Sequence, residues 1–182
     1  MTSEKSKMLA GEWYDPSDPE LKKDRNFARS LCRRLNLDSE MEPKALLEKL
    51  LVRVPKALTI SPPFFCDYGY NIELEDDVYF NVNCVLLDTC RISIGSGTLL
   101  GPGVHIYTVN HPMDAAQRRT GKEIGKPVQI GRDVWVGGAS VICPGVHIGD
   151  RTVIGAGSVV CKDLPSGVFA AGNPCRLIRH LE

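Results

Sequence analysis

A large apolar residue returns every six positions over most of the chain beyond residue 73. The longest unbroken run is Ile130, Val136, Ile142, Ile148, Ile154 and Val160. Two shorter runs precede it: Leu74, Phe80, Leu86 and Ile92, and then Ile94, Leu100 and Ile106. A period of six matches neither the 3.6 of an α-helix nor the 2 of a strand, but it matches a short strand followed by a tight turn. Three such units make one triangular coil, so the pattern predicts an all-β solenoid, a parallel β-helix with these residues pointing inward.

Two other positions of the repeat carry small residues. Glycine often follows the apolar residue directly, at positions 95, 101, 131, 137, 149 and 155. We expect these glycines to permit the turn at each corner because glycine tolerates a positive φ. Four places after the apolar residue stands a small or β-branched side chain: Thr98, Val104, Val134, Ser140, Val146, Thr152 and Ser158.

The N-terminal third of the chain follows a helical pattern instead. Ser17-Asp18-Pro19-Glu20 places glutamate three residues after serine, with proline in the first turn, which predicts a helix start. One apolar face follows, ending near Asn36: Leu21, Ala28, Leu31 and Leu35. A second amphipathic piece runs from Pro43 to Val52 and ends before Pro55, with four leucines buried: Leu46, Leu47, Leu50 and Leu51. Residues 60–72 look extended. We therefore divide the chain into a helical segment, 1–58, and a β-helix domain, 59–182, that ends in a short C-terminal tail.

The repeat stops in the stretch YTVNHPMDAAQRRTGKEIGKP, residues 107–127. His111 stands where the regular spacing ends, and residues 112–127 leave the coil as an excursion loop. Long loops that interrupt a rigid scaffold often carry function. A lone histidine is nevertheless more often a surface or capped residue, so the residues alone leave both interpretations open.

Composition and charge exclude several function classes. Lys plus Arg and Asp plus Glu both number 22, so we expect neither nucleic acid nor a membrane as a partner. No stretch reaches the roughly 18 apolar residues of a membrane span, and residues 1–16 lack the apolar centre of a signal peptide, which predicts a cytoplasmic protein. The seven cysteines form no C-x-x-C pair, and we expect them to be reduced and mostly buried. No phosphate-loop or dinucleotide-binding glycine motif indicates ATP or NAD.

An ordered set of motifs extends over nearly the whole chain: KSKMLAGEWYD, FFCDYGYNI, HIYTVNHP, GKPVQIGRDVWVGG, GAGSVVCKD and AAGNPCRLIR. On these motifs the sequence resembles the hexapeptide-repeat sugar O-acetyltransferases, the group of maltose and galactoside acetyltransferases. The resemblance implies a left-handed β-helix, a homotrimer with active sites between subunits, acetyl-CoA as co-substrate, a sugar acceptor and no metal.

The resemblance also assigns the chemistry. It implies that His111, in the NHP motif, is the catalytic base. A neutral imidazole, with an ordinary pKa of about 6.5, can accept the proton of a sugar hydroxyl as that hydroxyl attacks the thioester. The developing oxyanion requires a preorganised donor, and the resemblance implies the backbone N–H of Gly138 in WVGG. No acyl-enzyme is required, so the cysteines need not be nucleophiles.

Acceptor-binding residues implied by the resemblance are Arg25, Asp67, Asn81 and Asp88. Asn81 could also be an outward solvent contact, and Arg25 could form a salt bridge on the helix surface. Galactoside enzymes have two consecutive acids where this chain has Asp88-Thr89, which leaves the identity of the sugar open.

Cofactor-binding residues implied by the resemblance are Trp135, Gly138, Ala156, Cys161, Lys162, Arg176 and Arg179. Small residues would let the pantetheine arm approach the backbone, and the lysine and arginines would meet its phosphates. Without the resemblance, the GAGS segment could be an ordinary corner, the two arginines a solvated tail, and Trp135 a contact with the next subunit.

Three alternatives remain at this level. A zinc-dependent carbonic anhydrase of the left-handed β-helix type needs three histidines that converge on the metal, and the four histidines here show no such pattern. A non-catalytic solenoid has no need of His111, and an acyltransferase could act on a non-sugar acceptor. We further hypothesise that His111 of one subunit faces the Trp135 region of its neighbour.

Overall fold

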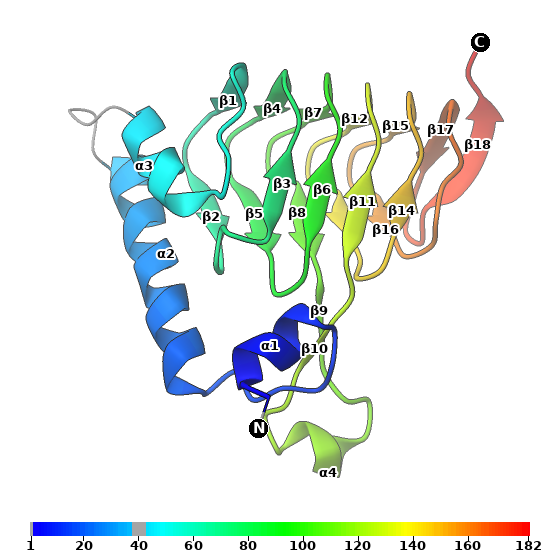
Figure 1. The fold of residues 1–182 in the computed structure, drawn as a ribbon. Helices are drawn as coiled ribbons and strands as arrows, with labels where there is room; N and C mark the ends of the chain where they lie inside the picture. The colour runs from blue at the N-terminus through cyan, green and yellow to red at the C-terminus, as the bar shows by residue number, and fades with distance from the viewer. Residues whose placement is uncertain (1, 38–42) are drawn as a thin grey trace.

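The computed structural model, which describes residues 2–37 and 43–182, is a three-sided parallel β-solenoid with two helices packed at its N-terminal end and two near the excursion loop (Figure 1). The helices are α1 (Glu4–Leu9), α2 (Pro19–Leu37), α3 (Pro43–Leu50) and α4 (Ala115–Arg118). No helix in the described part of the chain is long and apolar enough to span a membrane.

Three parallel sheets form the walls of the solenoid. The seven-stranded sheet contains, in spatial order, β1 (Leu58–Ile60), β4 (Val78–Phe80), β7 (Leu99–Leu100), β12 (Trp135–Val136), β15 (Val153–Ile154), β17 (Val168–Ala171) and the antiparallel β18 (Arg176–His180). The five-stranded sheet contains β2 (Phe64–Cys66), β5 (Cys84–Leu87), β8 (His105–Tyr107), β13 (Val141–Ile142) and β16 (Val159–Val160). The four-stranded sheet contains β3 (Ile72–Leu74), β6 (Ile92–Ile94), β11 (Val128–Ile130) and β14 (His147–Ile148).

Three corners join the walls, and we name each by the sheets that it connects. The 7–5 corner consists of residues 61–63, 81–83, 101–104, 137–140 and 155–158. The 5–4 corner consists of residues 67–71, 88–91, 108–127, 143–146 and 161–163, and it includes the excursion loop. The 4–7 corner consists of residues 75–77, 95–98, 131–134, 149–152 and 165–167.

The six-residue spacing predicts the core correctly. All thirteen residues of the three runs are buried, and the most exposed of them, Leu74, has 7% of its surface accessible. They stack in register from coil to coil, as Leu100, Val136 and Ile154 do in the seven-stranded sheet. Full burial of such a side chain contributes about 1.5–3 kcal/mol, so the stacks are the main source of stability.

The glycines after the apolar residue have a different role from the one expected. None of the six has a positive φ; that conformation occurs two residues later, at Gly97, Gly103 and Gly157 and also at Asp133 and Ala139. What these glycines provide is close approach between coils. A Cβ on Gly101 would lie 2.6 Å from the backbone nitrogen of Gly138, and one on Gly137 would lie 2.5 Å from that of Ala156.

Hydroxyl groups four places after the apolar residue satisfy backbone carbonyls at the corners. Thr98 Oγ1 donates to Gly131 O at 2.9 Å, and Thr152 Oγ1 donates to Pro165 O at 2.7 Å. Both threonines are fully buried. A buried hydroxyl without a partner would cost about 1–3 kcal/mol, which explains why the repeat tolerates polar side chains here.

The helical segment forms as predicted, with one change at its start. Helix α2 begins at Pro19, and its cap is Asp18, whose Oδ1 accepts from the N–H groups of Glu20 (2.9 Å) and Leu21 (3.3 Å). The predicted cap, Ser17, therefore stands one residue too early. At the other end Asn36 docks the helix on the solenoid: its amide exchanges hydrogen bonds with the backbone of Phe64 at 3.0 and 2.8 Å.

The excursion begins with a small antiparallel ladder. Strands β9 (Val109–Asn110) and β10 (Ile124–Gly125) pair with each other and hold the two ends of the loop together. The N-terminal segment crosses this ladder, because Tyr14 and Glu123 exchange two backbone hydrogen bonds of 3.0 Å. A second, smaller core of Met8, Tyr14, Leu21 and Tyr68 lies beneath the crossing.

Candidate functional site

The 5–4 corner is extended in the first three coils. The step across it is eight positions from Cys66 to Leu74 and eight from Leu86 to Ile94, but six from Ile142 to Ile148. In the third coil the excursion lies within the step from Ile106 to Ile130. Asp67, Asp88 and His111 lie one on each extended corner. The sequence does contain a sign of this extension: one six-residue run ends at Ile92 and the next starts at Ile94, a shift of two positions. We did not interpret this shift from the sequence alone.

His111 directly follows β9, at the point where the excursion leaves the ladder. Its side chain is exposed, and no described residue hydrogen-bonds its ring. The backbone on which it stands is fixed by the pairing of Asn110 with Ile124 and by the hydrogen bond from Lys126 N to Thr108 O (2.8 Å). The imidazole is therefore accessible to a substrate, while the backbone that carries it is held in place.

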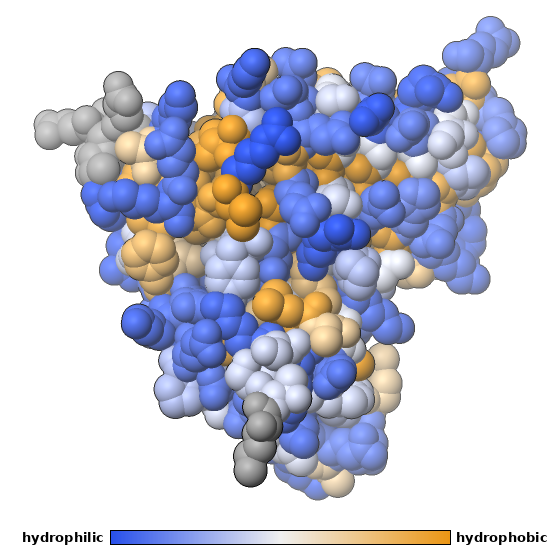
Figure 2. All heavy atoms as spheres, viewed as in Figure 1, coloured by the Kyte–Doolittle hydropathy of each residue, from blue (hydrophilic) through white to orange (hydrophobic). Residues whose placement is uncertain are grey.

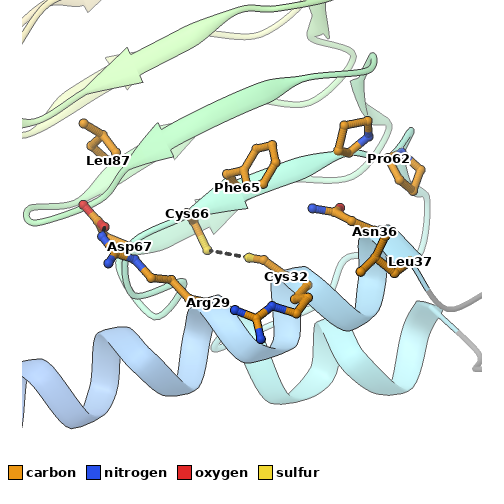
Figure 3. A pocket seen from close by; sticks show the side chains of 11 residues that line it. Arg29, Cys32, Asn36, Leu37, Pro62, Phe65, Cys66, Asp67 and Leu87 are labelled. Atoms are coloured by element: carbon orange, nitrogen blue, oxygen red, sulfur yellow. Dashed lines mark hydrogen bonds and ion pairs between the residues drawn. The ribbon is translucent and has the colours of Figure 1, made fainter.

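Asp67 is half-buried at the end of β2, beside a groove of about 640 Å³ between α2 and β2 (Figure 3). Its Oδ1 forms an ion pair of 3.0 Å with Arg29 of α2, which sequence analysis missed. The floor of the groove holds Cys32 and Cys66, whose sulfurs lie 3.6 Å apart. The contact with Cys32, together with burial, raises the pKa of Cys66 well above its usual range, so this thiol stays protonated.

Asp88 occupies the next extended corner but does not reach solvent. Its side chain is fully buried, and its two carboxylate oxygens accept three backbone N–H groups: Asp67 at 3.0 Å, Tyr68 at 2.9 Å and Gly69 at 2.7 Å. In the single chain these oxygens hold the turn that carries Asp67, and direct contact between Asp88 and an acceptor stays a prediction.

Arg25 faces a polar hollow of about 360 Å³ next to the base of the excursion. Its guanidinium donates to Tyr68 Oη at 2.7 Å and to Pro16 O at 3.0 Å. It forms none of the salt bridges among the described residues, so the surface-pair interpretation does not hold. Sequence analysis missed Tyr68 and Glu123, which line the same hollow, because only the folded chain brings the three segments together.

A second set of candidate residues stacks along the 7–5 corner. Asn81 and Gly138 are half-buried, while Ala156 is exposed one coil beyond Gly138. Among the described residues, the N–H groups of Gly138 and Ala156 form no hydrogen bond. The equivalent groups on the earlier coils are not available: Pro102 has none, and that of Val82 is taken by Asn81 Oδ1 at 2.8 Å. The corner thus presents two free donors about 4.8 Å apart.

Trp135 lies on the outer face of the seven-stranded sheet beside this corner, with 55% of its surface exposed. Its row continues through Val153 and Phe169 to Arg179 on β18. Arg176 pairs with Ala171 at the end of β17, directly above the coil of Ala156. Cys161 and Lys162 are exposed but lie at the 5–4 corner, on the side of His111.

One chain therefore divides the candidate residues into two groups. Arg25, Asp67, His111, Cys161 and Lys162 belong to the helical segment and the 5–4 corner. The 7–5 corner and its adjoining sheet carry the others: Asn81, Trp135, Gly138, Ala156, Arg176 and Arg179. The groups stand at opposite ends of the strands of the five-stranded sheet, about 10 Å or more apart at 3.3 Å per residue. Within a single chain they do not meet.

The arrangement of the described residues bears on metal ligation and on thiol chemistry. In residues 2–37 and 43–182 no group of three His, Cys, Asp or Glu side chains is placed to hold a metal ion. Burial raises the pKa of Cys84 to about 11 and also raises that of Cys90, which keeps these thiols in their less reactive protonated form.

Comparisons with known proteins agree with the fold. Residues 7–55 match the family model "maltose acetyltransferase hexapeptide capping motif", and residues 127–162 match "bacterial transferase hexapeptide (six repeats)". Nodulation protein L of Rhizobium meliloti is 46% identical over 178 residues, which cover 96% of this chain and 97% of that protein. The chain belongs to the hexapeptide-repeat acetyltransferase family, in the group with the maltose acetyltransferase capping motif.

Two solved members of this family resemble the chain over almost its whole length. A maltose O-acetyltransferase from Clostridium difficile 630 has 45% identity and a TM-score of 0.95, covering 99% of this chain and 98% of its own. A hexapeptide-repeat acetyltransferase from Vibrio cholerae O1 biovar eltor, solved in complex with acetyl-CoA, has 38% identity and a TM-score of 0.92, covering 99% of both chains.

Proposed function

We propose that the protein is an acetyl-CoA-dependent O-acetyltransferase that transfers the acetyl group to a sugar hydroxyl, with His111 as general base. The observation that carries this proposal is the division of the site between two corners. The 5–4 corner offers an exposed imidazole on a fixed backbone. The 7–5 corner offers free N–H donors beside small residues and an exposed tryptophan. The transfer needs both the base and the N–H donors, so the two corners must come together to form an active site.

A homotrimer would make them meet. If the five-stranded sheet of each chain faces a threefold axis, the 5–4 corner of one subunit meets the 7–5 corner of the next. The outer faces of the walls support this arrangement. The four-stranded sheet presents polar residues, and Figure 2 shows a largely hydrophilic surface over β6, β11 and β14. The five-stranded sheet instead presents a mostly apolar row: Phe65, Val85, His105, Val141 and Val159.

In the proposed reaction the acceptor oxygen attacks the thioester carbonyl as His111 takes the hydroxyl proton. The neighbouring subunit's Gly138 donates its free N–H to the oxyanion that develops on the carbonyl oxygen. The C–S bond then breaks, the acetyl ester is complete, and the proton on His111 passes to the leaving thiolate. The enzyme contributes a base, a donor and orientation, and it forms no covalent bond to the acetyl group.

The 7–5 corner fits an extended acyl carrier with amide groups. Ala156 is exposed, and a Cβ on Gly157 would find no atom within 4 Å, so the surface is open at this point. The free N–H of Ala156 can donate to a pantetheine carbonyl. Arg176 and Arg179 of the same chain, with Lys162 of the neighbour, would meet the phosphates. We place the reaction in the cytoplasm, where acetyl-CoA is made and thiols stay reduced.

We propose that Asp67, Asn81 and Arg25 orient the acceptor. A carboxylate, an amide and a guanidinium together match the donors and acceptors of a sugar hydroxyl array. Thr89 stands where galactoside enzymes carry a second acid, so the acceptor test has to include maltose, glucose, galactosides, amino sugars and simple non-sugar alcohols.

The test is thiol release from acetyl-CoA with this acceptor panel, using the wild type and His111→Ala. We expect acceptor-dependent release that falls by roughly two to four orders of magnitude in the variant. His147→Ala is the matched control, since the His147 side chain is exposed on the outer face of the four-stranded sheet, and it should retain wild-type rates. Release with non-sugar alcohols alone would move the acceptor outside carbohydrates. No release at all, or equal rates in wild type and His111→Ala, would overturn the proposal.

A further inference from the structure

A chain of buried polar groups connects the three extended parts of the 5–4 corner. Asp88 and Thr108 occupy equivalent places in successive coils, each two residues after a core residue that pairs with the other, Leu86 and Ile106. Both side chains are fully buried. Aliphatic residues would fit such an environment without a desolvation cost, so two polar groups in a row require an explanation.

Each of the two residues holds the corner of the coil before it. The carboxylate of Asp88 accepts the N–H groups of residues 67 to 69. The hydroxyl of Thr108 accepts from Cys90 N at 2.9 Å and donates to Leu87 O at 2.7 Å. It also contacts the hydroxyl of Thr89 at 3.2 Å. These bonds define the turn on which Asp88 itself stands.

The chain of bonds ends at the excursion loop. Thr108 O accepts from Lys126 N at 2.8 Å, which joins the outgoing and returning ends of the loop, and His111 follows three residues later. At the other end, the turn held by Asp88 carries Asp67 and Tyr68, and these meet Arg29 and Arg25. No buried side-chain nitrogen or oxygen along this path, or elsewhere among the described residues, lacks a hydrogen-bond partner.

We propose that Asp88 and Thr108 form a buried polar ladder that sets the position of the acceptor turn, residues 67–69, relative to the loop that carries His111. This inference rests on the proposed function and extends it: the two residues are positioning residues that touch no substrate. A fully satisfied network in a low-dielectric interior resists displacement, because breaking one bond leaves an unpaired group. Reaction rates fall steeply when a base and an acceptor are misaligned by even about 1 Å.

The kinetic test compares Thr108→Val with Thr152→Val. Both changes delete a fully buried hydroxyl while keeping the shape of the side chain, but Thr152 lies at the 4–7 corner, where its partner is Pro165 O. We expect Thr108→Val and Asp88→Asn to lower kcat/KM for the acceptor by roughly 10- to 100-fold, with the KM for acetyl-CoA changed less than about twofold. Thr108→Ser, which keeps the hydroxyl, should restore most of the rate. Thr152→Val should lose stability without a change in the acceptor constants.

Amide hydrogen exchange provides a readout that does not depend on turnover. Asp88→Asn should accelerate exchange at residues 67–69, because the amide that replaces one oxygen can no longer accept from their N–H groups. Thr108→Val should accelerate exchange at Cys90, whose N–H loses its acceptor, and Thr152→Val should change neither region. The inference is wrong if these amides stay protected, or if Thr108→Val and Thr152→Val have equal kinetic effects. A wild type without transferase activity but with the expected exchange pattern would overturn the proposed function and leave the ladder as a scaffold device.

Discussion

At the scale of single residues, the buried carboxyl of Asp88 has a pKa far above the usual range of an aspartate. The pKa of Asp88 is raised to about 7: burial is the main cause and the charge of Asp67 adds to it, while hydrogen bonds from the backbone of Tyr68 and Gly69 oppose the rise. In the unfolded chain its pKa is about 3.9. Between pH 4 and pH 7 the folded protein therefore holds a proton at this site that the unfolded chain has lost. Linkage then requires this contribution to stability to fall as the pH rises through that window.

Asp88→Asn should remove this contribution. We expect the free energy of unfolding of the wild type, relative to that of the variant, to decrease by up to about 4 kcal/mol between pH 4 and pH 7, since a tenfold difference in proton affinity between the folded and unfolded states corresponds to about 1.4 kcal/mol. Urea unfolding of both proteins at several pH values measures the difference. Carboxylates with lowered pKa values, such as Glu75, make the free energy of unfolding rise with pH below about pH 4.5. They are the same in both proteins, so their effect cancels when the two free energies are subtracted. Parallel curves for the two proteins would mean that Asp88 stays ionised when folded.

Single residues also show how far sequence reasoning extends. The place of His111 at the edge of the excursion follows from the break in the repeat, whereas its role as a base stays a prediction drawn from the NHP motif. The burial of Asp88 could not be predicted, because an aspartate two residues after a core position looks the same in the sequence whether it points to solvent or to three N–H groups. Arg29, Tyr68 and Glu123 join the site only through contacts between segments distant in the chain.

At the scale of elements, the corners depend on how closely neighbouring coils approach. A glycine in this fold can be required for its φ or for its missing side chain, and the structure separates the two cases. Gly137 has an ordinary φ but no space for a Cβ, whereas Gly157 has a φ of +70° and open space around it.

Two alanine substitutions test which requirement costs more. Gly137→Ala should destabilise the protein by about 3 kcal/mol, the upper end of the usual cost of overpacking, because backbone atoms of the next coil must move. Gly157→Ala should cost only about 1–2 kcal/mol, the penalty of a left-handed conformation for an L-residue. Midpoints of urea unfolding rank the two variants. The reverse order would mean that backbone conformation, and not the approach of the coils, limits the corners.

The elements themselves were predictable to different degrees. The six-residue period predicts which residues form the core and that three sheets result, since a repeated spacing reports the same environment many times. Helices α2 and α3 follow from their amphipathic faces. The antiparallel ladder of β9 and β10 and its crossing by Tyr14 were not predicted, because each is a single pairing between distant segments and leaves no periodic trace.

At the scale of the whole molecule, the proposed trimer turns two incomplete corners into one site at each subunit boundary. Mixed trimers can test this directly. His111→Ala removes the base from the 5–4 corner, and Ala156→Trp fills the open surface of the 7–5 corner; each should be inactive alone. A trimer with both kinds of subunit contains one boundary where an intact 5–4 corner meets an intact 7–5 corner. We therefore expect about one third of wild-type activity in mixed trimers.

The measurement uses two affinity tags to isolate the mixed trimers after co-expression. A mixture of separately purified variants, never allowed to exchange subunits, is the control and should remain inactive. If the mixed trimers are also inactive, each site is built within one subunit, and the separation of the two corners would need another explanation.

The ladder of β9 and β10 has a consequence for how this protein can change. Because Asn110 and Ile124 are paired, the two ends of the excursion stay adjacent whatever lies between them. The coils on either side keep their own register, as the pairing of Ile94 with Ile130 shows. The tip around α4, which buries no residue, is thus free to vary in length and composition without disturbing the scaffold. Insertions and deletions between relatives are therefore expected to gather in this one segment, while the coils remain under the constraint of stacking.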